Sequence, residues 1–176
     1  GSGAPARIYG HIADVLMLDW YPVPHLPLES LADQMDEASS HLPLGKPLWA
    51  VLQAFDWRDY PQRDPSKPRV GRFPDHYEIR FMTYLAIVHG AKGLFYYNLR
   101  RPNGVTLFEY PEQWQAISRV AEEIRSIQPA LEGGRKVPPP FTQKTGKVEA
   151  GAWRWRGMDY VILLNRTREH QLFPGE

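Results

Sequence analysis

Apolar residues first gather in a nearly continuous run over residues 13–21, which stops at Pro22. Continuous runs of this length are typical of strands that are buried on both faces, as in a parallel sheet. A second run covers residues 48–55 and a third covers residues 94–98. The pattern therefore predicts three strands of a parallel sheet.

Helical spacing separates these runs. In residues 29–39, 75–90 and 111–128, apolar side chains recur three or four positions apart, as on one face of a helix. Asp75 and Glu78 have the spacing of an N-terminal capping box, so we favour this structural role over a catalytic one for Glu78. Strands that alternate with helices of this length predict right-handed crossovers within a parallel sheet.

The pattern changes near the C-terminal end of the chain. The alternation stops at Pro129, and residues 133–140 are rich in Gly and Pro, which predicts a stiff connector. Residues 148–155 and 160–165 then form a hairpin pattern. Because a two-stranded hairpin is barely stable alone, we expect this second module to be incomplete.

Composition excludes several classes of protein. The 176 residues include 21 basic and 20 acidic ones, so nucleic acid and anionic membranes are not indicated as partners. The absence of cysteine excludes a disulfide scaffold and a thiolate metal site. The six histidines show no metal-binding spacing, and there is no phosphate-binding glycine loop, so we expect neither a metal nor another cofactor. The chain has no run of about 18 apolar residues that would span a membrane.

Each predicted strand ends in polar groups that lie beside aromatic rings. Ligands of parallel α/β folds meet the carboxyl ends of the strands. Sugars need both kinds of group, because rings cover their C–H faces while amides and carboxylates bind their hydroxyls. We therefore predict a carbohydrate-binding site formed by Trp20, Tyr21, Asp56, Trp57, Tyr96, Tyr97 and Asn98. In the alternative interpretation, these rings only fill space at the end of the sheet.

Asp19 and Gln53 are the candidate catalytic residues. Asp19 follows an unbroken apolar run, where desolvation would raise its pKa and suit it to acid/base work; it could equally bind the backbone of a neighbouring loop. Gln53 lies within an apolar strand, so it needs a ligand or a neighbouring segment as partner when buried. It cannot be a nucleophilic carboxylate, but it could orient one. For Asp56 we favour a turn-capping role.

The order of residues 14–22, 46–55 and 75–98 resembles the last three βα units of a (β/α)8-barrel glycoside hydrolase, of the clan that includes β-galactosidases and cellulases. The most specific part is a Glu-x-Arg helix that leads into Gly-Ala-Lys-Gly and an aromatic strand. Residues 153–165 are similar to the opening strands of the β-sandwich that often follows such barrels.

The resemblance implies an α/β fold with a partial (β/α)8 TIM barrel over residues 1–134. A linker and the beginning of an all-β sandwich would follow over residues 135–176. A closed barrel takes roughly 250 residues, so a missing segment or another chain would supply the rest. The implied function is hydrolysis of glycosidic bonds in oligo- or polysaccharides by the whole protein, with this chain inactive by itself. The resemblance also implies an extracellular or periplasmic location.

One departure from the family leaves alternatives open. The family's retaining mechanism uses two glutamates, and the position most like the nucleophile holds Gln53. Either stereochemical outcome needs two carboxylates beside the bond, and here only Asp19, or less readily Asp56, can be one. A non-catalytic or degenerate sugar-binding barrel is therefore the main alternative. A third interpretation is a small α/β domain unrelated to sugars, which a parallel sheet of only three strands would favour.

Overall fold

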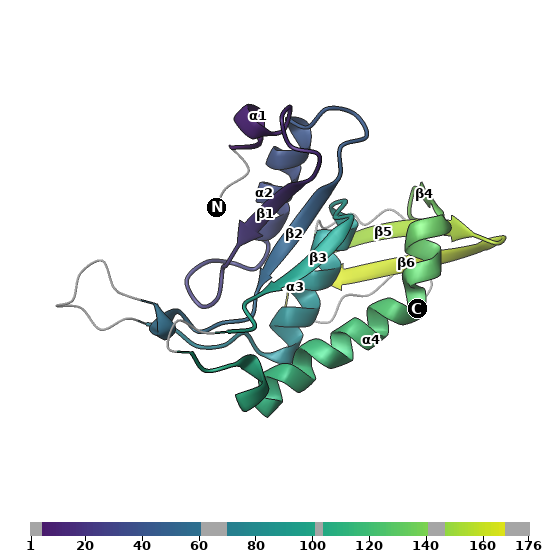
Figure 1. Cartoon of the computed structure of the whole chain (residues 1–176). Helices are drawn as coiled ribbons and strands as arrows, with labels where there is room; N and C mark the ends of the chain where they lie inside the picture. Colours follow the sequence, from purple (N-terminus) through teal and green to yellow (C-terminus); the bar gives the residue numbers. More distant parts are fainter. Residues whose placement is uncertain (1–4, 61–69, 101–103, 141–146, 168–176) are drawn as a thin grey trace. The chain divides into compact units, whose positions relative to one another are not determined.

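A computed structural model describes residues 5–60, 70–100, 104–140 and 147–167 (Figure 1). The chain divides into two units, Gly1–Val120 and Ala121–Glu176. This division falls inside helix α4 (Pro111–Gly133), ahead of the boundary at residue 134 that the sequence suggests.

The first unit is built on a parallel sheet. Strands β1 (Leu16–Trp20), β2 (Leu48–Gln53) and β3 (Gly93–Tyr97) pair in that order, and all three run the same way. Helix α2 (Ser30–Ser40) connects β1 to β2, and helix α3 (His76–Val88) connects β2 to β3 (Figure 1). The remaining elements are short: α1 (Ala6–Tyr9), and the single 3-10 turns η1 (Trp57–Asp59) and η2 (Leu107–Glu109).

The two faces of this sheet differ in burial. Leu18 and Leu52, whose side chains point to one face, are 3% and 0% exposed. This face belongs to the core that α2 and α3 complete, since α2 packs on β1 and α3 packs on β2. Met17, Phe95 and Tyr97 occupy the alternate positions and are 46%, 47% and 40% exposed. The period of two along each strand therefore separates a helix-covered face from a more open one.

The second unit contains an antiparallel sheet. Strands β4 (Arg135–Val137), β5 (Val148–Trp155) and β6 (Met158–Asn165) pair in that order. The predicted hairpin of β5 and β6 is confirmed, and the two residues of its turn, Arg156 and Gly157, have φ values of 49° and 79°. Positive φ at both central residues is the signature of a type I′ turn, whose twist matches that of the strands.

The prediction of a partial (β/α)8 barrel followed by a partial β-sandwich is wrong. The described strands form an open parallel sheet of three strands and a separate antiparallel sheet of three strands. A continuous apolar run is common to barrel strands and to open parallel sheets. Closure depends instead on strand tilt and stagger, which the apolar pattern does not encode. The parallel sheet has three described strands, as expected for the alternative interpretation of a small α/β domain.

Two boundaries near Pro129 also differ from the prediction. Helix α4 continues through Pro129 and ends at Gly133, although proline lacks the N–H that a helix interior uses. The predicted connector over residues 133–140 contains β4, which pairs with β5. Pairing with a neighbouring strand thus overrides the local Gly and Pro signal.

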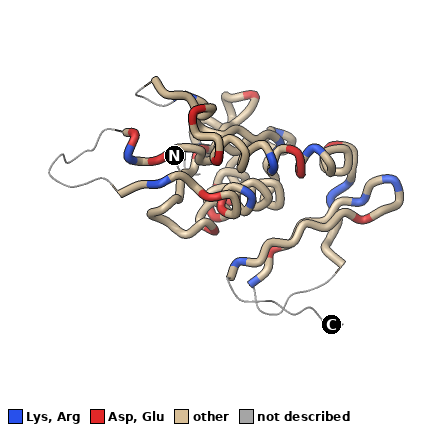
Figure 2. Tube along the Cα trace, turned by 90° about the horizontal axis from the view of Figure 1, so that it is seen from below, with Lys and Arg blue, Asp and Glu red and all other residues tan. Residues whose placement is uncertain are grey.

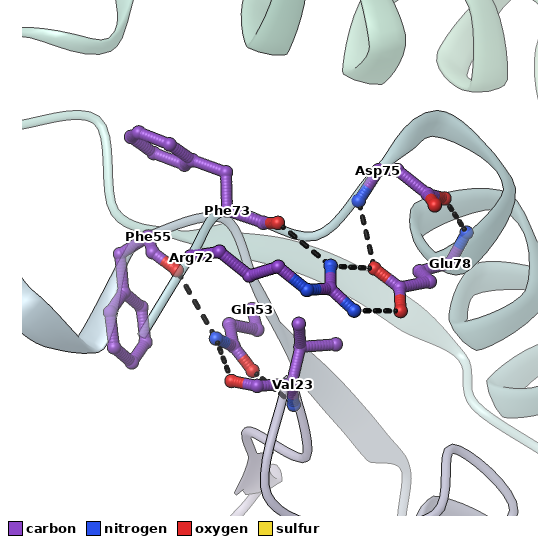
Figure 3. Close-up of polar contacts among 7 residues, drawn as sticks. All are labelled: Val23, Gln53, Phe55, Arg72, Phe73, Asp75 and Glu78. Atoms are coloured by element: carbon purple, nitrogen blue, oxygen red, sulfur yellow. Dashed lines mark hydrogen bonds and ion pairs between the residues drawn. The ribbon is translucent and has the colours of Figure 1, made fainter. Parts of the chain in front are cut away.

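The capping box at the start of α3 is confirmed. The Asp75 side chain accepts a hydrogen bond from the Glu78 backbone N–H at 2.8 Å, and the Asp75 backbone N–H donates to Glu78 Oε2 at 2.9 Å. Arg72 adds two bonds to the same carboxylate, at 2.6 and 2.7 Å. Glu78 therefore starts the helix and also anchors the segment before it (Figure 3).

Asp75→Ala should lower the free energy of unfolding by about 1 kcal/mol, because the Glu78 N–H at the helix start loses its acceptor. Urea titration followed by circular dichroism measures the change. Glu122→Ala, an exposed carboxylate in α4, is the control and should stay within about 0.5 kcal/mol of the parent chain. Equal losses in the two variants would contradict the capping role.

Candidate functional site

Five aromatic rings meet at the carboxyl ends of the three parallel strands. Phe55 is their centre: its ring centroid lies 4.8 Å from Tyr60, 4.9 Å from Trp57, 5.1 Å from Tyr21 and 5.8 Å from Tyr97. Tyr21 and Tyr97 also stack on each other, with centroids 5.7 Å apart. We call these five residues the aromatic cluster.

The parallel topology explains why the cluster forms. Tyr97 is the last residue of β3 and pairs in register with Gln53, the last residue of β2. Tyr21 follows directly on β1, and Phe55 lies just beyond β2. Because parallel strands end at the same edge of a sheet, rings that are distant in the sequence come together there.

Burial raises the pKa of two phenols of the cluster. Phe55 is 2% exposed, whereas Tyr97 is 40% exposed and opens the cluster to solvent. Burial raises the pKa of Tyr21, and the nearby charge of Asp19 raises it further. Burial also raises the pKa of Tyr60, as does a side-chain hydrogen bond with Tyr97. At neutral pH both hydroxyls are protonated, as an ordinary phenol also is, and can donate hydrogen bonds.

Gln53 is fully buried, and its amide is bonded to backbone (Figure 3). Its Oε1 accepts from the Val23 N–H at 2.9 Å, and its Nε2 donates to the Val23 and Phe55 carbonyls at 2.8 and 3.1 Å. The partner that a buried Gln requires is thus the loop after β1, together with the end of its own strand. These bonds make Gln53 a positioning residue beneath the cluster.

Asp56 caps a turn, as the sequence suggests. Its Oδ1 accepts from the Arg58 N–H at 2.8 Å and starts η1, while its Oδ2 binds Arg58 Nε at 2.8 Å. The backbone of Gly71 lies against this turn, and a Cβ there would overlap the Asp56 carboxylate. Asp56 is only 2% exposed. Because it starts the turn that carries Trp57 and leads to Tyr60, its bonds help to hold both rings in place.

Two predicted binding residues point away from the cluster. The Trp20 indole N–H donates to Ser30 Oγ in α2 at 2.8 Å. The Tyr96 hydroxyl shares a 2.8 Å hydrogen bond with Thr83 Oγ1 in α3, and burial raises its pKa. Both side chains bind the helices that cover the sheet, because strand residues alternate between its faces.

In the sequence, Asp19 precedes the residues of the cluster and Asn98 follows them. Asp19 pairs in register with Val51 and is half-buried, on the same face as Tyr21 two residues later. Asn98 Nδ2 donates to the Tyr60 hydroxyl at 3.0 Å and to the Arg100 carbonyl at 2.7 Å. Its Oδ1 is buried and has no hydrogen-bond partner among the described residues, so it retains an accepting capacity.

The sequence interpretation missed Phe55, Tyr60 and His25 as members of this site. The His25 ring lies 6.3 Å from Trp57. The spacing Phe55-x-Trp57-x-x-Tyr60 directly after a strand is a signal that could have found the first two. For His25 the sequence offers no comparable signal.

Charge and composition limit what the site can hold. Acidic and basic residues are interspersed along the described trace (Figure 2). Among the described residues, no group of three His, Asp or Glu side chains could hold a metal ion. In the same part of the chain, no helix is long and apolar enough to cross a membrane. No protein-family model, curated protein or solved structure matches the chain.

Gln53→Glu should destabilise the chain in a pH-dependent way. Its carboxylate would face the Val23 and Phe55 carbonyls without a donor, which at pH 7 should cost at least about 2 kcal/mol. The folded pKa of this Glu would lie above its unfolded value of about 4.3, so stability should fall as pH rises between the two values. Urea titrations at several pH values measure this, with exposed Gln115→Glu as control. If stability depended on pH in the same way in both variants, the inferred role of the Gln53 hydrogen bonds to Val23 and Phe55 would be contradicted.

The raised tyrosine pKa values predict a loss of stability at alkaline pH. Tyr21 and Tyr60 keep their protons in the folded chain above pH 10.0, where the unfolded chain ionises. Their contribution is therefore complete below about pH 10 and decreases as the pH rises toward the folded values. Urea midpoints should fall over this range, and less steeply for Tyr60→Phe. Ionisation of all nine tyrosines near pH 10 without unfolding would be the opposite result.

Proposed function

We propose that this chain binds carbohydrate at the aromatic cluster. The observation that carries the proposal is the packing of four rings around Phe55, with the partly exposed Tyr97 at the edge and the amide of Asn98 beside it. Rings supply flat apolar faces for the C–H groups of a sugar. The neighbouring amide and phenols supply hydrogen bonds for its hydroxyls.

The polar groups of the cluster match a neutral polyhydroxyl ligand. The Tyr21 and Tyr60 phenols stay protonated at neutral pH and can donate. Asn98 Oδ1 is an acceptor without a partner in the described part of the chain. Donors and acceptors thus lie together beside an aromatic surface.

Binding without turnover has more support than hydrolysis by this chain. Glycoside hydrolysis needs two carboxylates beside the bond. Asp56 is committed to Arg58 and the η1 turn, and Gln53 is an amide bonded to backbone. Of the two carboxylates that the sequence suggests for catalysis, only Asp19 remains a candidate, so hydrolysis would need a further carboxylate. The non-catalytic interpretation therefore fits these residues better than the hydrolase one.

Titration calorimetry with cellotetraose and a β-linked galactotetraose tests the proposal. We expect measurable binding by the parent chain and a loss of roughly tenfold in affinity for Tyr97→Ala, equivalent to about 1.4 kcal/mol. Phe95→Ala is the matched control, because Phe95 lies on the same strand and face, is 47% exposed, and stacks on Trp49 outside the cluster. The control should keep the parent affinity.

Each other outcome has a defined meaning. Absence of binding to both sugars would overturn the proposal, and equal losses in Tyr97→Ala and Phe95→Ala would remove the cluster as its site. A reducing-sugar assay accompanies the titration. Turnover by the parent chain that disappears in Asp19→Asn would favour the hydrolase interpretation instead.

A further inference from the structure

A pocket lies in the first unit where α4 begins. It shares no residue with the aromatic cluster, and Glu109, the last residue of the 3-10 turn η2, contributes to it. Its lining combines two aromatic rings, two carboxylates, one proline and one amide: Phe73, Glu109, Tyr110, Pro111, Glu112 and Gln113.

Gln113 is the unexplained residue of this pocket. It is only 7% exposed, and its Nε2 has no hydrogen-bond partner among the described residues. A buried donor without an acceptor destabilises a fold, and native proteins retain few of them. By contrast, the amide of Gln53, which is also buried, is bonded at both of its ends. The unpaired Gln113 Nε2 therefore indicates a ligand that supplies the missing acceptor.

The other lining residues define the chemistry of that ligand. The Phe73 and Tyr110 rings lie 5.0 Å apart at a tilt of 47°, and they form an apolar wall. Glu109 Oε1 accepts from the Thr106 N–H at 2.9 Å, so this carboxylate is held in place. Glu112 is exposed in the first turn of α4, where the helix dipole favours a negative charge. Two carboxylates would repel an anion, and the positive end of the helix opposes a cation.

We propose that this pocket is a second carbohydrate site, which takes one neutral sugar ring. The aromatic wall would cover the C–H face of the ring, and Glu112 would accept from one of its hydroxyls. A hydroxyl both donates and accepts, so it pairs with the Gln113 amide whichever end of that amide it meets. The inference takes its ligand class from the proposed function but uses none of the residues of the aromatic cluster.

Gln113→Leu separates binding from folding. The substitution removes the unpaired donor and replaces Gln with an apolar side chain of similar size, so stability should be unchanged or higher. Titration with cellotetraose and the β-linked galactotetraose should show two sites in the parent chain and one in Gln113→Leu. Gln115→Leu, an exposed position in the same helix, is the control and should keep two.

Nuclear magnetic resonance identifies which site is lost. In the parent chain, added sugar should shift the Gln113 side-chain signals and the Glu112 backbone amide, and Tyr97→Ala should preserve these shifts. One parent site that Gln113→Leu leaves intact would overturn this inference while the proposed function stands. If the parent chain has one site, and this site survives Tyr97→Ala but not Gln113→Leu, the proposed function at the aromatic cluster would be overturned while this inference stands. Binding at neither site, or a large loss of stability in Gln113→Leu, would also overturn the inference.

Discussion

The amide of Gln53 is the constraint on which the end of the parallel sheet depends. It spans from the end of β2 to the loop after β1 through three hydrogen bonds to the backbone of Val23 and Phe55 (Figure 3). Tyr21 lies two residues before Val23, so these hydrogen bonds of Gln53 fix where the Tyr21 ring meets Phe55. No water competes for bonds at a side chain that is fully buried, which makes each of them strong. The aromatic cluster is therefore a consequence of one amide as well as of ring packing.

Ionised side chains extend this constraint along the chain. Asp56 starts the η1 turn that carries Trp57, and the close approach of Gly71 leaves no room for a side chain there. Arg72, the next residue, binds Glu78 at the start of α3. Because Glu78 also closes the capping box, one carboxylate ties the loop to the helix. Asp56 and Glu78, for which the sequence favours capping roles, thus both serve to hold backbone.

Local signals in the sequence predicted local structure well. The capping box of Asp75 and Glu78, the turn cap of Asp56 and the hairpin of β5 and β6 each depend on residues only a few positions apart. Relations between distant segments were not accessible in the same way. The sequence shows that Gln53 needs a partner, but Val23 becomes that partner only through the pairing of β1 with β2. Sheet closure is a relation of the same kind, and the barrel interpretation failed there.

The residues of the candidate site also depend on how the strands are arranged, and this arrangement decides which side chains it contains. Trp20, Tyr21, Tyr96 and Tyr97 are consecutive pairs, yet strand alternation sends one member of each pair to the helices and the other to the cluster. What remains at the edge is largely aromatic, and burial raises the pKa of the Tyr21 and Tyr60 phenols there. Glycoside hydrolysis needs two carboxylates beside the bond. Because Asp56 is paired with Arg58, the rings and the amide of Asn98 are the groups at this edge that suit recognition of hydroxyls, and they are the basis of the proposed binding function.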